Sequence, residues 1–173
     1  MRVVIFDRLE KPAPIGSGLI LQPVGLQVLD YVGLGDCMRA LGAPLDRLYG
    51  KSGRHVVLDV RYDALGKRAP LGLSVHRGAL FETLYSAALA AGVEIESGRI
   101  VTATSGGRLT FADGRESARF GLVIDALGMR SPLSRQPEAN LAYGALWASL
   151  DWAGPFDPRA LEQRYEAARK MAG

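Results

Sequence analysis

The chain has 173 residues, of which 48% are hydrophobic and 23% charged, as in an ordinary globular protein. Its formal net charge is +3, but the arginines are interspersed with acids and form no basic stripe of the kind that nucleic-acid binding requires. The single cysteine excludes an internal disulfide, and the two histidines, His55 and His76, are not spaced as a ligand pair. We therefore expect neither a metal nor a nucleic-acid partner.

The sequence also argues against a membrane protein. Its apolar runs are all far shorter than the ~20 residues that span a bilayer. The first residues lack the apolar stretch and the cleavage site of a signal peptide. We therefore expect no membrane association and a cytoplasmic location.

The first elements predict a strand, a loop and a helix. Residues 3–6 form a short β-branched apolar run, typical of a strand buried on both faces of a parallel sheet. Residues 11–18 are rich in proline and glycine and predict a loop. Pro23 suits the first turn of a helix that ends at Gly33. The residues that this helix would turn inward are Val24, Val28, Leu29 and Val32.

The middle of the chain predicts further strands around a long helix. Residues 50–54 read as a turn and residues 55–60 as a strand. From Arg77 a helical period returns, Gly92 ends it, and residues 93–96 predict a short strand. The apolar face of this helix comprises Leu80, Phe81, Leu84, Tyr85, Ala88 and Leu89.

The last part predicts a β-meander and a new layer. Residues 100–104 and 109–112 are strand-like, and Asp113-Gly114 signals a hairpin toward a third run near Phe120. Residues 122–124 predict a second buried strand. Asp157-Pro158 is typical of a helix start, and the inward residues of that helix would be Leu161, Tyr165 and Ala168. This order of elements predicts an α/β fold with a second layer after Pro132.

Asp7 ends the first predicted strand and has two interpretations. A carboxylate at the end of a buried strand holds the ribose in dinucleotide-binding folds. Many strands also end in Asp because its carboxylate stabilises the next turn. The spacing alone favours the second interpretation, and both stay open at this point.

Several blocks, taken together and in order, are similar to one family. They are residues 6–10, residues 16–23 with the helix ending at 33–36, residues 76–80 (His-Arg-Gly-Ala-Leu), residues 120–131 (Phe-Gly-Leu-Val-Ile-Asp-Ala-Leu-Gly-Met-Arg-Ser), residues 143–150 and residues 163–165. This series resembles the FAD-dependent monooxygenases related to p-hydroxybenzoate hydroxylase, the aromatic-ring hydroxylases, over essentially the whole chain.

The resemblance implies a fold and a function. The fold would be an incomplete FAD/NAD(P)-binding Rossmann-like domain with a β-meander over residues 1–133, and residues 134–173 would begin a substrate-domain sheet. The intact enzyme would use FAD and NAD(P)H to hydroxylate an aromatic or polycyclic substrate. Tyr143, Trp147 and Trp152 could line the substrate site, although aromatic residues at such spacings more often belong to a core.

The resemblance also implies cofactor-binding residues. Asp7 would hold the adenosine ribose, and Arg8 would lie over the adenine. Arg77 would approach the FAD phosphates, which a guanidinium can bind bidentately; its alternative is a solvated residue of the first helical turn. The remaining predicted cofactor-binding residues are Gly18 and Gln22, close to the flavin ring, and Gly128 and Ser131 in the second flavin motif.

The chain departs from the family in three ways. Leu127 replaces the aspartate of the second flavin motif, which puts nicotinamide use in doubt and keeps another flavin oxidoreductase or a halogenase open. The GxGxxG turn that normally precedes the first strand here is missing, as is the late flavin motif. We therefore expect a fragment that binds FAD weakly or not at all and is inactive alone.

The missing strand would leave two unpaired edges in a doubly wound sheet. We expect residues 3–6 and 122–124 to close up and pair directly. If they do not pair, a complementing chain that carries the missing strand is a candidate partner, and the protein is then a non-catalytic or split-protein binding module.

Overall fold

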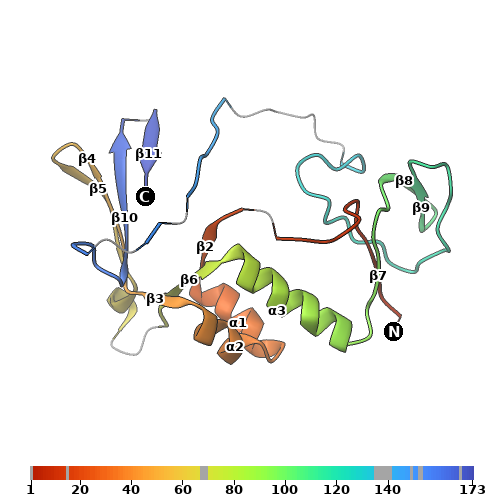
Figure 1. Cartoon of the computed structure of the whole chain (residues 1–173), viewed down its shortest axis with the longest axis horizontal. Helices are drawn as coiled ribbons and strands as arrows, with labels where there is room; N and C mark the ends of the chain where they lie inside the picture. The colour runs from red at the N-terminus through yellow and green to blue at the C-terminus, as the bar shows by residue number, and fades with distance from the viewer. Residues whose placement is uncertain are drawn as a thin grey trace. The chain divides into compact units, whose positions relative to one another are not determined.

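The structure is a computed structural model that describes residues 2–14, 16–66, 70–134, 142–148, 150–151, 154–167 and 169–173. Its contacts divide the chain into two compact units (Figure 1): unit 1 comprises Met1–Ala13 with Ala87–Leu146, and unit 2 comprises Pro14–Ser86 with Trp147–Gly173. The sequence predicted a domain boundary at residue 133, which differs from this division. That boundary stays a prediction about functional domains. Within the described ranges, the helices are too short or too polar to cross a membrane.

Unit 1 contains a parallel pair of strands and a hairpin. β1 (Val4–Phe6) pairs in parallel with β7 (Glu94–Glu96). β8 (Val101–Ser105) and β9 (Arg108–Phe111) form an antiparallel hairpin whose loop is Gly106-Gly107. All four strands confirm the sequence predictions, because each is a short β-branched or alternating run bounded by turn residues.

The core of unit 1 is a small cluster on the hairpin. Val101, Leu109 and Phe111 are buried, and three half-buried residues pack against them: Phe6, Val123 and Leu133. The ring centroids of Phe6 and Phe111 are 5.2 Å apart. β1 and residues 120–133, far apart in the sequence, therefore share one apolar cluster, which is defined here as the Phe111 cluster.

Three predictions for unit 1 are wrong. Residues 122–124 form no strand, and Leu122 and Ile124 are 76% and 78% exposed. They do not pair with β1, whose sole ladder among the described residues is the one with β7. β1 is also not buried on both faces, since Ile5 is 43% exposed. The physical reason is that β propensity alone does not create a ladder, which requires a neighbouring strand.

The third run of the predicted meander is present in weaker form. Residues 115–120 run beside β9 through an isolated bridge between Thr110 and Glu116. Backbone hydrogen bonds join Ser117 N to Leu109 O at 2.9 Å and Phe120 N to Gly107 O at 2.8 Å. The Asp113-Gly114 turn is therefore correct, but the ladder beyond it is irregular.

Unit 2 begins with a three-stranded antiparallel sheet covered by helices. The sheet has the order β2 (Gly18–Leu21), β6 (Gly72–His76), β3 (Ala43–Leu45). Two helices follow β2, α1 (Pro23–Tyr31) and α2 (Gly35–Leu41). The helices and the sheet enclose a core of Leu26, Leu29, Met38, Leu73 and Val75, and Met38 is fully buried.

The end of α1 is closed as the sequence predicts. Gly33 has φ +77° and stands one residue beyond the C-cap. Its N–H donates to Asp30 O at 3.0 Å, and Leu34 N–H donates to Leu29 O at 2.8 Å. This is the Schellman pattern, which a glycine permits because it adopts positive φ without strain.

The predicted inward face of α1 is confirmed at Leu29 and wrong at Val24, Val28 and Val32, which are exposed. Leu26 and Leu29 are buried, whereas Val24 and Val28 are 70% and 59% exposed. Both faces of this nine-residue helix carry apolar residues. The sequence period could not choose between them, and packing against β6 and α2 decides.

The long helix α3 (Arg77–Ala90) confirms the prediction, but its apolar face is only half-buried. Leu80 packs on the unit 2 core, whereas Leu84 is 43% and Leu89 is 49% exposed. The helix ends at Gly92, with φ +76°, in the same hydrogen-bond pattern as α1.

The second sheet of unit 2 joins distant segments. Its order is β11 (Lys170–Ala172), β10 (Ala160–Glu166), β4 (Arg47–Ser52), β5 (His55–Arg61), and the 3-10 turn η1 (Tyr62–Leu65) follows β5. Figure 1 shows β10, in blue, beside β4 and β5. The predicted strand at 55–60 is confirmed, but Gly50 lies within β4 and the turn centres on Gly53 and Arg54.

The predicted C-terminal helix is wrong, because residues 160–166 form strand β10 and Ala168 lies outside the described residues. Leu161 and Tyr165 satisfy a period of two as well as a period near four. β10 pairs in parallel with β4 over six residue pairs. Arg159 and Asp46 add a bidentate ion pair at the start of the two strands. These non-local contacts override the local helical pattern.

Candidate functional site

The start of α3 and the loop before β2 lie together in unit 2. Arg77 N–H donates to Ser17 O at 2.9 Å, and Gly18 pairs with His76. A Cβ built on Gly16 would lie 3.1 Å from Arg77 Nε, and Gly16 has φ +112°. A side chain at Gly16 would therefore be strained and would crowd the guanidinium, so this glycine makes room for Arg77.

The Arg77 guanidinium is available for an anion. Among the described residues no carboxylate forms an ion pair with it. A cation in the first turn of a helix also opposes the helix dipole, so the position gains nothing from local electrostatics. An exposed, unpaired arginine held against a glycine-containing loop is suited to bind phosphate or carboxylate groups.

Gly18 and Gln22 lie at the two ends of the β2 segment. Gly18 begins β2, and a Cβ built there would meet Val75 O at 3.4 Å, an ordinary contact distance. Gln22 is the N-cap residue of α1, and its Oε1 accepts a hydrogen bond from the hydroxyl of the buried Tyr62 at 2.8 Å. The Gln22 amide thus has a structural role, and its contact with a flavin stays a prediction.

In unit 1, Asp7 stabilises the turn after its strand, which is the second of its two predicted interpretations. Its Oδ1 accepts a hydrogen bond from Leu9 N–H at 2.8 Å, so the carboxylate stabilises the turn after β1. Its main chain continues the pairing, since Asp7 N–H donates to Glu96 O and Asp7 O accepts from Arg99 N–H. Oδ2 has no described hydrogen-bond partner. Arg8 is exposed, and ribose and adenine binding by the two residues stay predictions.

The segment 125–131 organises itself around Asp125. Asp125 Oδ2 accepts a hydrogen bond from Ser131 Oγ at 2.6 Å, and Oδ1 accepts from Leu127 N–H at 3.0 Å. Gly128 has φ +81° and forms the bend between them, with Ser131 N–H donating to Gly128 O. Asp125 lies two residues before Leu127, which replaces the aspartate of the second flavin motif. The structure gives it an internal role, and it ties down Ser131, one of the predicted site residues.

We expect the Ser131 hydrogen bond to be measurable as a pKa shift. It lowers the pKa of the Asp125 carboxyl from its ordinary value of 3.8, and the Leu127 N–H adds to this. Because the folded pKa is depressed, this contribution to stability is present above pH 3.8 and is lost as the pH falls through the folded pKa. Titration by carboxyl NMR should show the Asp125 pKa rising toward its ordinary value in Ser131→Ala.

Asp113 provides the internal reference for this titration. Its pKa is lowered mainly by the side-chain hydrogen bond from Arg115, so it should not respond to Ser131→Ala. An Asp125 pKa that is the same in the wild type and in Ser131→Ala would show that the two side chains are not bonded in solution.

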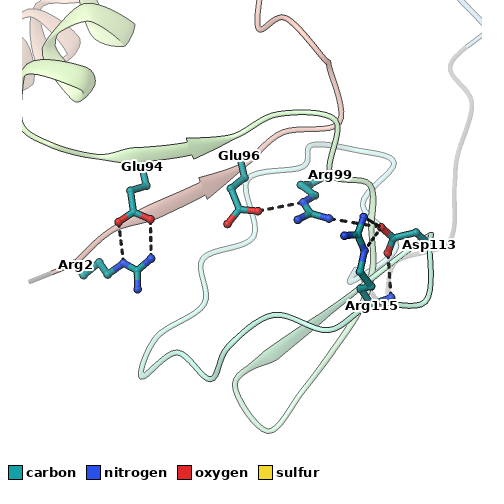
Figure 2. Close-up of polar contacts among 6 residues, drawn as sticks. All are labelled: Arg2, Glu94, Glu96, Arg99, Asp113 and Arg115. Atoms are coloured by element: carbon teal, nitrogen blue, oxygen red, sulfur yellow. Dashed lines mark hydrogen bonds and ion pairs between the residues drawn. The ribbon is translucent and has the colours of Figure 1, made fainter.

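Figure 2 shows a set of ion pairs that the sequence analysis did not identify. Arg99 contacts Glu96 at 3.1 Å and Asp113 at 3.5 Å, and Asp113 also binds Arg115 at 2.6 Å. The Arg99 guanidinium carbon lies 5.1 Å from the centroid of the Phe111 ring. These contacts join β7 to the turn after β9. The ion pair between Arg99 and Asp113 forms because the chain between them folds back. The spacing of these residues in the sequence therefore does not predict it.

The predicted site residues thus fall into two groups on different units. Gly18, Gln22 and Arg77 belong to unit 2, and Asp7, Arg8, Gly128 and Ser131 belong to unit 1. Each group is ordered by local contacts, and convergence of the two groups on one nucleotide stays a prediction. Tyr143 and Trp147 are 69% and 60% exposed, and Trp152 lies outside the described residues.

Comparison with solved structures shows the fold. The chain is similar in structure to the 2-methyl-3-hydroxypyridine-5-carboxylic acid oxygenase, with a TM-score of 0.57 and 22% identity over 66% of this chain and 30% of that one. It is also similar to PqsL of Pseudomonas aeruginosa, a probable FAD-dependent monooxygenase, with a TM-score of 0.53 and 18% identity over 66% of this chain and 33% of that one. The chain therefore has the fold of part of an FAD-dependent monooxygenase, which confirms the predicted fold class and resemblance.

A sequence relative points the same way. The chain is 31% identical over 130 residues to AqdB1 of Rhodococcus erythropolis, described as a 2-heptyl-3-hydroxy-4(1H)-quinolone synthase. The match covers 75% of this chain and 34% of that protein. The chain thus spans about a third of the length of the proteins that it matches. No protein-family model matches it.

Proposed function

We propose that this chain is part of an FAD-dependent monooxygenase that hydroxylates an aromatic or polycyclic substrate and takes its electrons from NAD(P)H. The observation that carries the proposal is Arg77, an arginine without a described carboxylate partner that lies against Gly16 at the start of a helix. The monooxygenase fold supports it. FAD would supply the redox and oxygen chemistry, and the residues of the chain would bind and orient it.

The residues present fit FAD in part. Arg77 would bind its phosphates, since a guanidinium pairs bidentately with anionic oxygens. Asp7 Oδ2 would accept a hydrogen bond from the adenosine ribose, while Oδ1 stays on Leu9 N–H. Arg8 would cover the adenine, and Gly18 to Gln22 would pass along the flavin ring.

The second flavin motif fits less well. Leu127 offers no carboxylate, and the carboxylate of Asp125 is bonded within its own loop. Gly128 and Ser131 would then contribute backbone shape rather than a charged contact. We therefore propose that this chain by itself binds FAD weakly and has no hydroxylase activity, and that the rest of a longer protein would complete the site.

Titration of the purified chain with FAD tests the proposal. We expect saturable but weak binding, and we expect Arg77→Gln to weaken it at least about tenfold, because a charge-assisted hydrogen bond contributes about 1.5–3 kcal/mol. Equilibrium dialysis is the appropriate measurement, since it detects weak complexes without relying on a spectral change.

Arg54→Gln is the matched control. Arg54 lies in the exposed turn between β4 and β5, so its loss changes net charge as Arg77→Gln does. Equal weakening by both variants would reduce the effect to general electrostatics. Saturable binding that Arg77→Gln leaves intact would remove Arg77 from the site, and no saturable binding at all would count against a flavin site in this chain.

A further inference from the structure

The sheet of β2, β6 and β3 has two different faces (Figure 1). One face packs in the core with α1 and α2, through Leu19, Leu21, Leu73 and Val75. Since side chains alternate along a strand, the residues between these belong to the other face. That second face carries exposed or half-buried residues, which are Gly18, Ile20, Ser74 and His76. It is therefore accessible to a ligand.

Tyr62 covers one end of this second face. Leu21 pairs with Leu73, so the next step of the same register sets Gln22 opposite Gly72. A Cβ built on Gly72 would lie 2.6 Å from the Tyr62 hydroxyl oxygen and 2.7 Å from its ring carbon Cζ. The glycine therefore leaves the space that the tyrosine ring occupies, and Tyr62 is only 6% exposed.

The Tyr62 hydroxyl holds one half of the Gln22 amide. It donates a hydrogen bond to Gln22 Oε1 at 2.8 Å. Among the described residues, Gln22 Nε2 has no hydrogen-bond partner, and Gln22 is exposed. A glutamine side chain has one acceptor oxygen and one NH2 donor. Because Tyr62 holds the oxygen, the group that Gln22 presents to a ligand is the NH2 donor.

Gln22 and Arg77 lie at opposite ends of the ladder between β2 and β6. Arg77 follows His76, which pairs with Gly18, and Gln22 follows the last residue of β2. Extended chain from Gly18 to Gln22 spans about 13 Å. The ribityl chain of FAD separates its ring from its phosphates, so phosphates at Arg77 would leave the ring to reach Gln22. The ring has carbonyl oxygens and nitrogens that accept hydrogen bonds.

We propose that Tyr62 is a positioning residue for the flavin ring: it fixes the Gln22 amide so that the NH2 group donates to an acceptor atom of the ring. The inference rests on the proposed function and adds to it a residue that no sequence motif signalled. The alternative is a purely structural bond, which would only seat η1 on the sheet and would leave the Gln22 NH2 group without a ligand.

NMR of the ligand-free chain tests the positioning. Gln27 is the internal reference, because it lies on α1, is exposed and has no described side-chain partner. The heteronuclear NOE of Gln22 Nε2 should exceed that of Gln27 Nε2, and it should fall to the Gln27 value in Tyr62→Phe. This variant keeps the ring over Gly72 and strands no buried polar group. Equal mobility of the two glutamines in the wild type would overturn the inference.

FAD affinity tests the donor. Gln22→Glu keeps an acceptor for the buried Tyr62 hydroxyl but replaces the NH2 donor with a second oxygen. Gln27→Glu, which adds the same charge at the exposed residue of α1, is the matched control. In equilibrium dialysis, Gln22→Glu should weaken FAD binding at least about fivefold more than Gln27→Glu does, since a hydrogen bond is lost and a carboxylate then meets an acceptor.

ADP-ribose separates the ring from the rest of the cofactor. It has the adenosine and the pyrophosphate of FAD but no flavin ring. The two glutamate variants should therefore weaken its binding equally, whereas Arg77→Gln should weaken the binding of both ligands. A loss specific to Gln22→Glu that ADP-ribose shares would contradict the inference, because the partner of Gln22 would then not be the ring.

A double variant tests whether Tyr62 acts through Gln22. Tyr62→Phe alone should weaken FAD binding about threefold, because an unfixed amide must be ordered on binding. In the Gln22→Glu background it should have no further effect, since residues of one hydrogen-bond network are not additive. The same loss in both backgrounds would mean that Tyr62 acts independently of Gln22.

The measurements separate this inference from the proposed function. Saturable FAD binding that Gln22→Glu and Gln27→Glu weaken equally would overturn the role of Gln22 and Tyr62 and leave the flavin site in place. Absence of saturable FAD binding to the wild-type chain would count against the proposed function itself and would remove the ligand assigned to Gln22.

Discussion

We expect Leu29→Ala to destabilise unit 2 by about 2–5 kcal/mol, the usual cost of emptying a buried leucine site. Leu29 is 6% exposed and packs with Leu26 and Met38 between α1, α2 and β6. Its carbonyl also accepts the hydrogen bond from Leu34 N–H that closes α1. The free energy of unfolding, measured by urea denaturation with circular dichroism, should fall accordingly.

Val28→Ala is the matched control on the adjacent residue of the same helix. Val28 is 59% exposed, so its truncation should change stability by no more than about 0.5 kcal/mol. Comparing the stability losses of the two variants shows which face of α1 is buried. A larger loss in Val28→Ala than in Leu29→Ala would restore the inward valine face that the sequence suggested and would contradict the structure.

The second large effect is expected at Gly107. This glycine has φ +80°, and a Cβ built on it would lie 2.5 Å from Phe120 O, a backbone atom that cannot simply rotate away. Gly107→Ala should therefore cost about 1–2 kcal/mol for the left-handed conformation and a further 1–3 kcal/mol for the overlap. It should also weaken the hydrogen bond from Phe120 N–H to Gly107 O.

Gly106→Ala separates the two costs. Gly106 precedes Gly107 in the same loop and has φ +56°, but a Cβ there would meet no atom within 4 Å. This variant should lose only the conformational part, about 1–2 kcal/mol. Thermal unfolding of both variants and the wild type checks the difference. Equal losses would show that residues 117–120 do not lie against the loop between β8 and β9.

The consequence of Gly107→Ala reaches beyond the hairpin. The Phe120 ring lies 6.0 Å from that of Phe6, centroid to centroid. Displacing Phe120 should therefore loosen the contact of β1 with the Phe111 cluster, and with it the turn in which Asp7 binds Leu9 N–H. A change at the hairpin would reach a candidate site residue through packing alone.

Elements whose signals are local could be predicted from the residues alone. β1, β7 and the hairpin were predictable because β-branched runs are bounded by glycine turns. The ends of α1 and α3 were predictable because Gly33 and Gly92 supply the positive φ that a helix terminus needs. The order of motifs, from Asp7 through Arg77 to Gly128, was enough to identify the monooxygenase fold.

Every feature that requires a neighbouring segment depended on the fold of the chain. Residues 160–166 became a strand because β4 offers a partner, and residues 122–124 did not because no described strand lies beside them. Packing turned Leu26 rather than Val28 inward, and the turn at Gly128 brought Ser131 to Asp125. The physical reason is that a ladder, a buried face and a side-chain hydrogen bond each join two surfaces, and a local pattern describes only one of them.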